Sequence, residues 1–186
     1  MAGWIKNRFL ITFLLLTLFV GCMMWWSARS DREGPPINQG VLDLSRWQDH
    51  NRSMLNLDGE WEFYPNQLLK PGDVPRGTKT QNYIQVPGKW NGWTDANGVM
   101  MKGKDYGTYR IVVRNAPVGE MLAIAKNYAR FSDKLYIDGA LAGDSGQPAE
   151  IRERYTPRNV PYTAYFKTAS GEFEILLQVA NYDYKY

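Results

Sequence analysis

The stretch Thr-Tyr-Arg-Ile-Val-Val-Arg, residues 108–114, indicates the fold class of this chain most clearly. It is rich in β-branched and aromatic side chains, which pack well on the pleated surface of a sheet and are enriched in strands. Helical periodicity of apolar residues is almost absent from residue 41 onward. The stretch therefore predicts a strand, and the segments around it have the same character.

Further short runs of this kind lie on both sides, separated by turn-forming residues. They cover residues 54–57, 60–64, 83–86, 121–126, 134–137, 140–142, 162–167 and 173–179. Asp58-Gly59 and Asp138-Gly139 stand between adjacent runs, and Asp-Gly is favoured in the two-residue turns of hairpins. Roughly eight or nine short strands without βαβ alternation predict an all-β fold, an antiparallel sandwich or barrel.

The run at residues 60–64 alternates in polarity. Trp61 and Phe63 fall on one face of the predicted strand, whereas Glu60 and Glu62 fall on the other. Such alternation is typical of a half-buried strand. We therefore expect Trp61 in the core and both glutamates on a solvated outer face.

The sequence predicts no catalytic centre, no metal site and no cofactor. The chain has one histidine and one cysteine, which is too few for the common zinc ligand sets or for an internal disulfide. Paired carboxylates can act as acid and base in glycoside hydrolysis. However, Glu60 and Glu62 are expected on an outer face, and Glu150 and Glu153 lie among arginines. We interpret both pairs as surface charge and expect that the protein is not an enzyme.

An apolar segment without charge, Phe9 to Trp26, precedes the predicted strands. Its length just suffices for a helix that spans a hydrocarbon core. Lys6 and Arg8 come before it, and positively charged flanks favour the cytoplasmic side. Residues 1–28 are therefore expected to form a cell-membrane anchor or signal segment, with a cytoplasmic N-terminus and an extracytoplasmic remainder.

Two alternatives to an uncleaved transmembrane helix stay open. A cleaved signal peptide needs small residues at its cleavage site, and Trp26 before Ala28 fits this poorly. A lipoprotein signal needs a cysteine after a run of small residues, and Val20-Gly21-Cys22 half resembles one. All three interpretations predict that the body of the protein is exported from the cytoplasm.

The body consists of a polar linker over residues 29–40 and a sandwich predicted over residues 41–186. The formal net charge of the chain is +3. Without Lys6 and Arg8, the 22 basic residues fall to 20, against 19 acidic ones. A nearly neutral body argues against nucleic acid as a partner, because phosphate binding needs clustered basic residues.

Aromatic and polar side chains gather in three places between the predicted strands. We take them as candidate ligand-binding residues: Trp90, Trp93 and Asp95; Tyr128, Arg130 and Asp133; Arg154 and Tyr155. Aromatic planes stack on the C–H faces of sugar rings, while neighbouring polar groups bind the hydroxyls. The predicted partner is therefore a carbohydrate-like small molecule or glycan. Alternatively, one or both tryptophans cap the end of the sandwich.

Four motifs occur in one order: LDGEWEFY at residues 57–64, VPGKW at 86–90, YGTYR at 106–110 and LYIDG at 135–139. The set resembles the galactose-binding-like jelly roll at the front of β-galactosidase- and β-glucuronidase-type glycoside hydrolases. It resembles more closely the extracellular domain of bacterial seven-transmembrane receptors with diverse intracellular signalling modules. The resemblance covers about Val41 to Tyr186.

The receptor resemblance implies a jelly-roll sandwich whose signal passes through downstream membrane helices to a cytoplasmic output domain. The sequence to Tyr186 contains neither, so we expect a fragment or a truncated product that binds but does not signal by this route. In the hydrolases the catalytic carboxylates belong to a later barrel, so both resemblances imply no catalysis in this stretch. The alternatives are the non-catalytic front domain of an exported hydrolase and a surface interaction module or lipoprotein.

Overall fold

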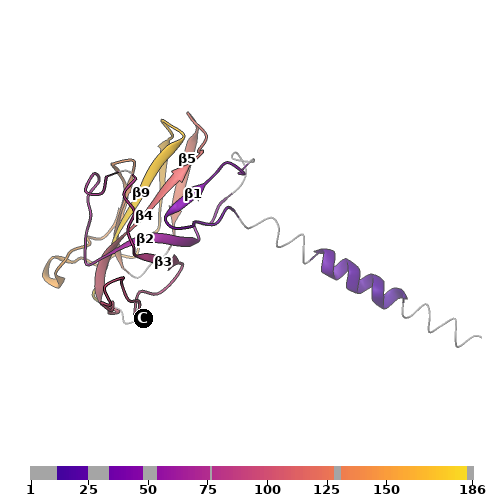
Figure 1. The fold of residues 1–186 in the computed structure, drawn as a ribbon, viewed down its shortest axis with the longest axis horizontal. Helices are drawn as coiled ribbons and strands as arrows, with labels where there is room; N and C mark the ends of the chain where they lie inside the picture. The colour runs from indigo at the N-terminus through magenta and orange to yellow at the C-terminus, as the bar shows by residue number, and fades with distance from the viewer. Residues whose placement is uncertain (1–11, 25–33, 48–53, 76, 128–130, 184–186) are drawn as a thin grey trace, which may run out of the picture. The chain divides into compact units, whose positions relative to one another are not determined.

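The computed structural model describes residues 12–24, 34–47, 54–75, 77–127 and 131–183, and the chain divides into two units. The smaller unit holds a helix over residues 12–24 (Figure 1). The residues of this helix are exposed. None of the helical segments described is long and apolar enough to cross a membrane. The predicted anchor, Phe9 to Trp26, extends beyond the described residues, so membrane attachment stays a prediction.

The described part of the larger unit contains nine strands and one short 3₁₀ helix. They are β1 (Val41–Asp43), β2 (Gly59–Pro65), β3 (Tyr83–Val86), β4 (Asp105–Arg114), β5 (Met121–Lys126), β6 (Ser132–Ile137), β7 (Ala140–Ser145), η1 (Arg152–Arg154), β8 (Tyr162–Lys167) and β9 (Glu172–Asn181). The prediction of an all-β, antiparallel fold is confirmed, with one exception: β1 runs parallel to β4.

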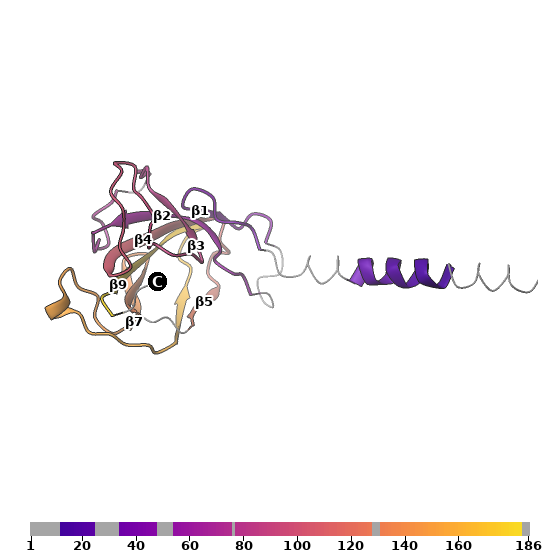
Figure 2. The ribbon, with the colours of Figure 1, turned by 90° about the horizontal axis from the view of Figure 1, so that it is seen from below.

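Seven strands form one large sheet in the order β3-β2-β4-β9-β6-β7, with β1 also paired to β4 (Figure 1). β4 and β9 lie in its middle and pair along their whole length, from Asp105 opposite Asn181 to Arg114 opposite Glu172. β5 and β8 form a separate two-stranded sheet. The sandwich is therefore unequal, with a broad layer and a narrow one (Figure 2).

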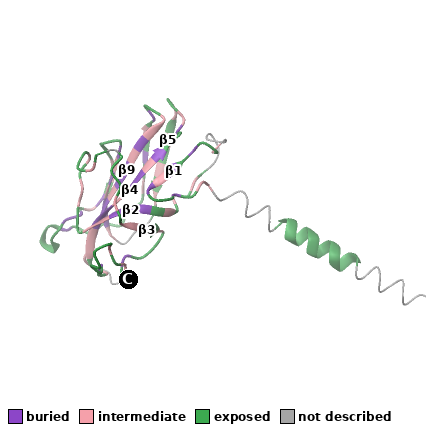
Figure 3. Cartoon of the chain, viewed as in Figure 1, coloured by how far each residue is buried: buried purple, intermediate pink, exposed green. Residues whose placement is uncertain are grey.

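The inner face of the large sheet carries buried apolar residues such as Phe63, Ile111 and Ile175, and buried positions lie along its central strands (Figure 3). The narrow sheet packs on part of this face, where the rings of Phe166 and Phe173 lie 5.1 Å apart. The segment of residues 87–103 covers another part. Burial of these side chains supplies the main driving force for folding.

Residues 66–75 and 77–82 cover part of the opposite, outer face. The Thr108 hydroxyl donates to the Gln67 carbonyl at 2.7 Å, and the Gln178 amide donates to the Leu69 carbonyl at 2.8 Å. Trp61 is buried as expected, but the expectation of a solvated Glu62 is wrong, because this side chain is 4% exposed. Strand alternation placed Glu62 on the correct face, but that face is not open to solvent.

The two Asp-Gly pairs play different roles. Asp138-Gly139 joins β6 to β7 with φ values of 47° and 90°, the left-handed pair that a two-residue hairpin requires. The prediction of a hairpin there is confirmed. At Asp58-Gly59 it is wrong, because Gly59 is the first residue of β2 and pairs with Val86 of β3. A Cβ atom on Gly59 would lie 2.3 Å from the Ile37 carbonyl oxygen. Glycine is therefore needed here because the backbone of Ile37 passes close to it.

We expect Gly59→Ala to lower the free energy of unfolding by ~2 kcal/mol, through this clash and a φ of +139°. Gly98→Ala is the matched control, because Gly98 has a φ of +82° but no atom within 4 Å of an added Cβ. It should cost about 1 kcal/mol, from backbone strain alone. Urea unfolding measures both, and equal losses would contradict the contact with Ile37.

Candidate functional site

An apolar pocket of about 310 Å³ lies on the inner face of the large sheet. We call it the aromatic pocket, because four aromatic side chains line it: Trp61 of β2, Tyr109 of β4, Trp90 and Phe131. Leu177 and Val179 of β9, the segment Val86–Lys89 and Asn181 complete the lining. Residues far apart in sequence thus converge on one cavity.

Trp90 is held in place by packing and by hydrogen bonds. Its ring is 9% exposed and belongs to a core cluster with Phe63 and Met101. The Trp90 indole N–H donates to the Gly103 carbonyl at 3.4 Å, and the Asn181 amide donates to the same oxygen at 2.9 Å. Both residues therefore present fixed surfaces to the aromatic pocket.

Trp93 stabilises the segment that carries Trp90 and is not among the residues that line the aromatic pocket. Its ring packs edge-on against Phe63, with centroids 5.1 Å apart, and its N–H donates to the Tyr83 carbonyl at 3.1 Å. Asp95 closes a turn, accepting from the Asn97 and Val99 amides at 2.9 and 2.7 Å.

Two polar groups of the aromatic pocket are available to a ligand. The Tyr109 hydroxyl makes no hydrogen bond with any described residue, and burial raises its pKa, so at neutral pH it is an uncharged donor and acceptor. The Lys89 side chain is exposed. The Trp61 indole N–H, in contrast, already donates to the Leu57 carbonyl at 3.0 Å. The described lining thus combines aromatic faces with few polar groups.

Asp133 is fully buried on β6 and joins the two sheets. The Lys126 ammonium of β5 lies 2.7 Å from one carboxylate oxygen, and the Tyr162 hydroxyl of β8 donates to the other at 2.5 Å. Burial raises the pKa of Tyr162, and the hydrogen bond to Asp133 adds to this shift. The Lys126 ammonium also lies 5.7 Å from the centroid of Phe131, which connects this cluster to the wall of the aromatic pocket.

The remaining candidates lie apart from the aromatic pocket or outside the described residues. Tyr155 is 8% exposed and packs edge-on against Tyr182 at 5.2 Å, while Arg154 is exposed in η1. Tyr128 and Arg130 lie outside the described residues. Of the predicted ligand-binding residues, Trp90 alone is among the described residues that line the aromatic pocket.

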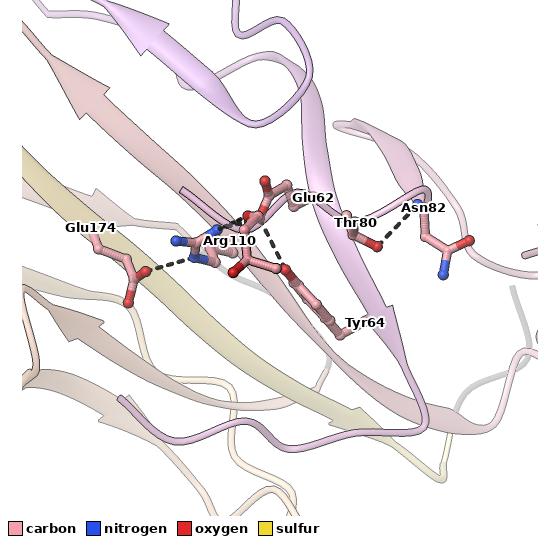
Figure 4. A network of polar contacts seen from close by, with 7 residues as sticks. Glu62, Tyr64, Thr80, Asn82, Arg110 and Glu174 are labelled. Carbon is pink, nitrogen blue, oxygen red and sulfur yellow. Dashed lines mark hydrogen bonds and ion pairs between the residues drawn. The ribbon is translucent and has the colours of Figure 1, made fainter. Parts of the chain in front are cut away.

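A buried ion triad on the outer face was missed by the sequence analysis. Arg110 is 1% exposed and donates to Glu62 and to Glu174, both at 2.6 Å (Figure 4). The Tyr64 hydroxyl also donates to Glu62, at 3.1 Å. The sequence contains a signal for it, because two predicted strands each carry a charged residue on the face opposite their apolar side chains. These residues are Glu62 and Arg110, which have opposite charges.

Electrostatics inside the triad follow from this geometry. Burial by itself lowers the pKa of Arg110, but the hydrogen bonds to Glu174 and Glu62 outweigh it and raise the pKa overall. Burial, together with the negative charge of Glu62, raises the pKa of Tyr64 to about 12. Arg110 therefore stays charged and Tyr64 stays uncharged across the physiological pH range, which suits a structural ion cluster.

No family model matches the chain, and no curated protein matches it. Solved structures with similar parts include a β-glucuronidase from Faecalibacterium prausnitzii (18% identity, TM-score 0.45, 68% of this chain and 20% of that chain). Another is a β-glucuronidase from Ruminococcus gnavus in complex with D-glucuronic acid (14% identity, TM-score 0.42, 67% of this chain and 21% of that chain). A third is a GH2 β-galacturonidase from Eisenbergiella tayi bound to galacturonate (13% identity, TM-score 0.39, 74% of this chain and 22% of that chain). The chain spans about a fifth of the length of these enzymes.

Proposed function

We propose that the larger unit is a non-catalytic module that binds a carbohydrate-like ligand in the aromatic pocket. The observation that carries this proposal is the convergence of Trp61, Trp90, Tyr109 and Phe131 on one cavity of about 310 Å³. Aromatic faces stack on the C–H faces of sugar rings, and the Tyr109 hydroxyl, which has no hydrogen-bond partner among the described residues, can bond a sugar hydroxyl. The volume is near the lower end of small-molecule pockets, about 300–1,000 Å³, which favours one or two sugar rings.

The absence of a catalytic role is part of the proposal. Among the described residues that line the aromatic pocket there is no carboxylate, thiol or imidazole. Glycoside hydrolysis ordinarily needs two carboxyl groups on either side of the scissile bond. The described lining offers a binding surface without an acid–base pair.

We further propose that the module is the extracytoplasmic part of a membrane receptor. The support is the uncharged segment Phe9 to Trp26, the basic residues Lys6 and Arg8 before it, and the resemblance of the strand motifs. Ligand binding would shift the receptor between states only if one state binds the ligand more tightly. The reading frame beyond Tyr186 tests this role: apolar helices favour the receptor, and a long barrel sequence favours an exported hydrolase.

Replacing Tyr109 by phenylalanine should weaken saccharide binding about three- to tenfold, because one hydrogen bond contributes ~0.5–1.5 kcal/mol. The ring and its packing against Phe63, 4.8 Å away between centroids, are retained. Tyr165→Phe is the matched control, because Tyr165 is 73% exposed on β8 and lies outside the lining. Isothermal titration calorimetry against a panel of mono- and disaccharides measures both variants.

Two results would count against a sugar site in the aromatic pocket. One is the absence of heat for every saccharide in the panel. The other is equal affinity of Tyr109→Phe and the unmodified protein. Trp90→Ala is a poor test, because truncating this buried ring is expected to cost ~3–5 kcal/mol of stability and would confound binding with folding.

A further inference from the structure

We propose that the ligand of the aromatic pocket carries a negative charge, a carboxylate on an otherwise uncharged ring, which pairs with Lys89. This inference rests on the proposed function and names the class of ligand. Lys89 is the one residue with a charged side chain among the described residues that line the pocket. The described lining therefore carries a positive charge.

The residues on either side of Lys89 fix the position of its backbone at the pocket wall. It follows Gly88, at which an added Cβ would lie 2.1 Å from the Gln85 carbonyl oxygen, so the chain turns tightly against β3 here. It precedes Trp90, whose ring is buried in the core. The backbone of Lys89 is thus held between two anchored positions at the pocket wall, while its side chain is exposed.

The ammonium of Lys89 also lacks a carboxylate partner among the described residues. Arg110, Lys126 and Arg152 in contrast lie within 2.8 Å of a carboxylate oxygen. An unpaired cation beside an apolar cavity attracts anions more strongly than one in open solvent, because the low-dielectric wall weakens screening. Lys89 is therefore available for a charge on the ligand.

The same charge argues against the other ligand class that an aromatic pocket can take. Clustered aromatic rings bind quaternary ammonium groups through cation–π interactions. Lys89 would repel such a cation from the mouth of the aromatic pocket. Aromatic faces, one hydroxyl and one lysine together fit a sugar acid: the ring stacks, a hydroxyl bonds Tyr109, and the carboxylate meets Lys89.

The test compares ligands that differ only in this charge. Methyl β-D-glucuronide and methyl β-D-glucoside share the ring and differ at C6, carboxylate against hydroxymethyl. We expect the unmodified protein to bind the glucuronide about fivefold more tightly than the glucoside at low ionic strength. A preference of this size is what a partly exposed ion pair contributes to affinity. The preference should shrink as sodium chloride screens the pair. Calorimetry measures both affinities.

Lys89→Gln should abolish the preference for the glucuronide over the glucoside. Lys167→Gln is the charge-matched control, since this exposed lysine on β8 lies outside the lining, and it should retain the full preference. Choline and phenylacetate complete the panel, as a cation and as an apolar carboxylate without hydroxyls.

The outcomes separate this inference from the proposed function. Equal binding of glucuronide and glucoside, unchanged in Lys89→Gln, overturns the charge requirement and leaves the sugar site standing. Binding of phenylacetate alone, lost in Lys89→Gln, overturns the sugar site and supports the charge requirement. Binding of choline in preference to both glycosides overturns the inference, and no binding of any probe overturns both.

Discussion

Replacing Arg110 by methionine is expected to lower the free energy of unfolding by about 3–5 kcal/mol. Arg110 neutralises Glu62, which is 4% exposed, and Glu174, and each lies 2.6 Å from the guanidinium. Methionine fills much of the same volume but leaves the Glu62 carboxylate buried without its cation. The cost comes from this uncompensated charge, because a buried charge needs a partner or solvent.

The structure offers a matched control on the same strand. Arg114 pairs with Glu172 at 3.1 Å, but the two side chains are 55% and 45% exposed. Water screens this pair, so Arg114→Met should change stability by less than about 1 kcal/mol. Urea unfolding followed by tryptophan fluorescence measures both variants. Similar losses for the two arginines would mean that the outer face is not shielded from water.

A variant without all three charges sharpens this test. Replacing Glu62 and Glu174 by glutamine together with Arg110→Met removes the triad instead of breaking it. The loss should be smaller than for Arg110→Met alone, because no unpaired ion stays buried. An equal or larger loss would contradict the unpaired charge as the cause of the Arg110→Met effect, because both variants lack the Arg110 side chain.

Asp133→Asn is expected to have an effect of similar size, about 3–5 kcal/mol. Asparagine keeps the shape of the side chain but leaves the Lys126 ammonium, 12% exposed, without its anion. It also weakens the hydrogen bond from Tyr162. Lys126 and Tyr162 belong to β5 and β8, so this variant should loosen the attachment of the narrow sheet to the broad one.

Amide hydrogen exchange distinguishes local loosening from global unfolding. Relative to the unmodified protein, Asp133→Asn should speed the exchange of amides in β5 and β8. The exchange of amides in β4 and β9, the middle of the large sheet, should change less. Asp144→Asn, at an exposed position of β7, is the control and should change exchange little. A uniform increase over all strands would contradict a role specific to the narrow sheet.

Local properties of the sequence were enough to predict most of the strands, although residues 54–57 form no strand and β1 was not predicted. Residues 121–126 and 83–86 form β5 and β3 as expected, because propensity and bounding turn residues act within a few positions. The Asp138-Gly139 turn was predictable for the same reason, since its φ values depend on the two residues themselves. Gly59 was misinterpreted because the contact that requires it comes from Ile37, outside its own strand.

The candidate site was predictable only in part. Trp90 and Trp93 are three positions apart in one glycine-containing segment, so no local feature distinguishes their roles. Trp90 lines the aromatic pocket, whereas Trp93 packs behind it. Tyr109 also lines the aromatic pocket, but it lies within a predicted strand and is not among the predicted ligand-binding residues. Its role depends on the neighbouring strands and on the segment opposite.

The sequence by itself determined the fold class, the positions of most strands and the division of each strand into two faces. The tertiary structure alone decided what covers each face, and therefore which side chains are buried. Arg110 meets partners 48 and 64 positions away, and the aromatic pocket combines β2, β4, β9 and the segment Val86–Trp90. Alternation along a strand is a local property, whereas burial depends on chain segments that approach from elsewhere.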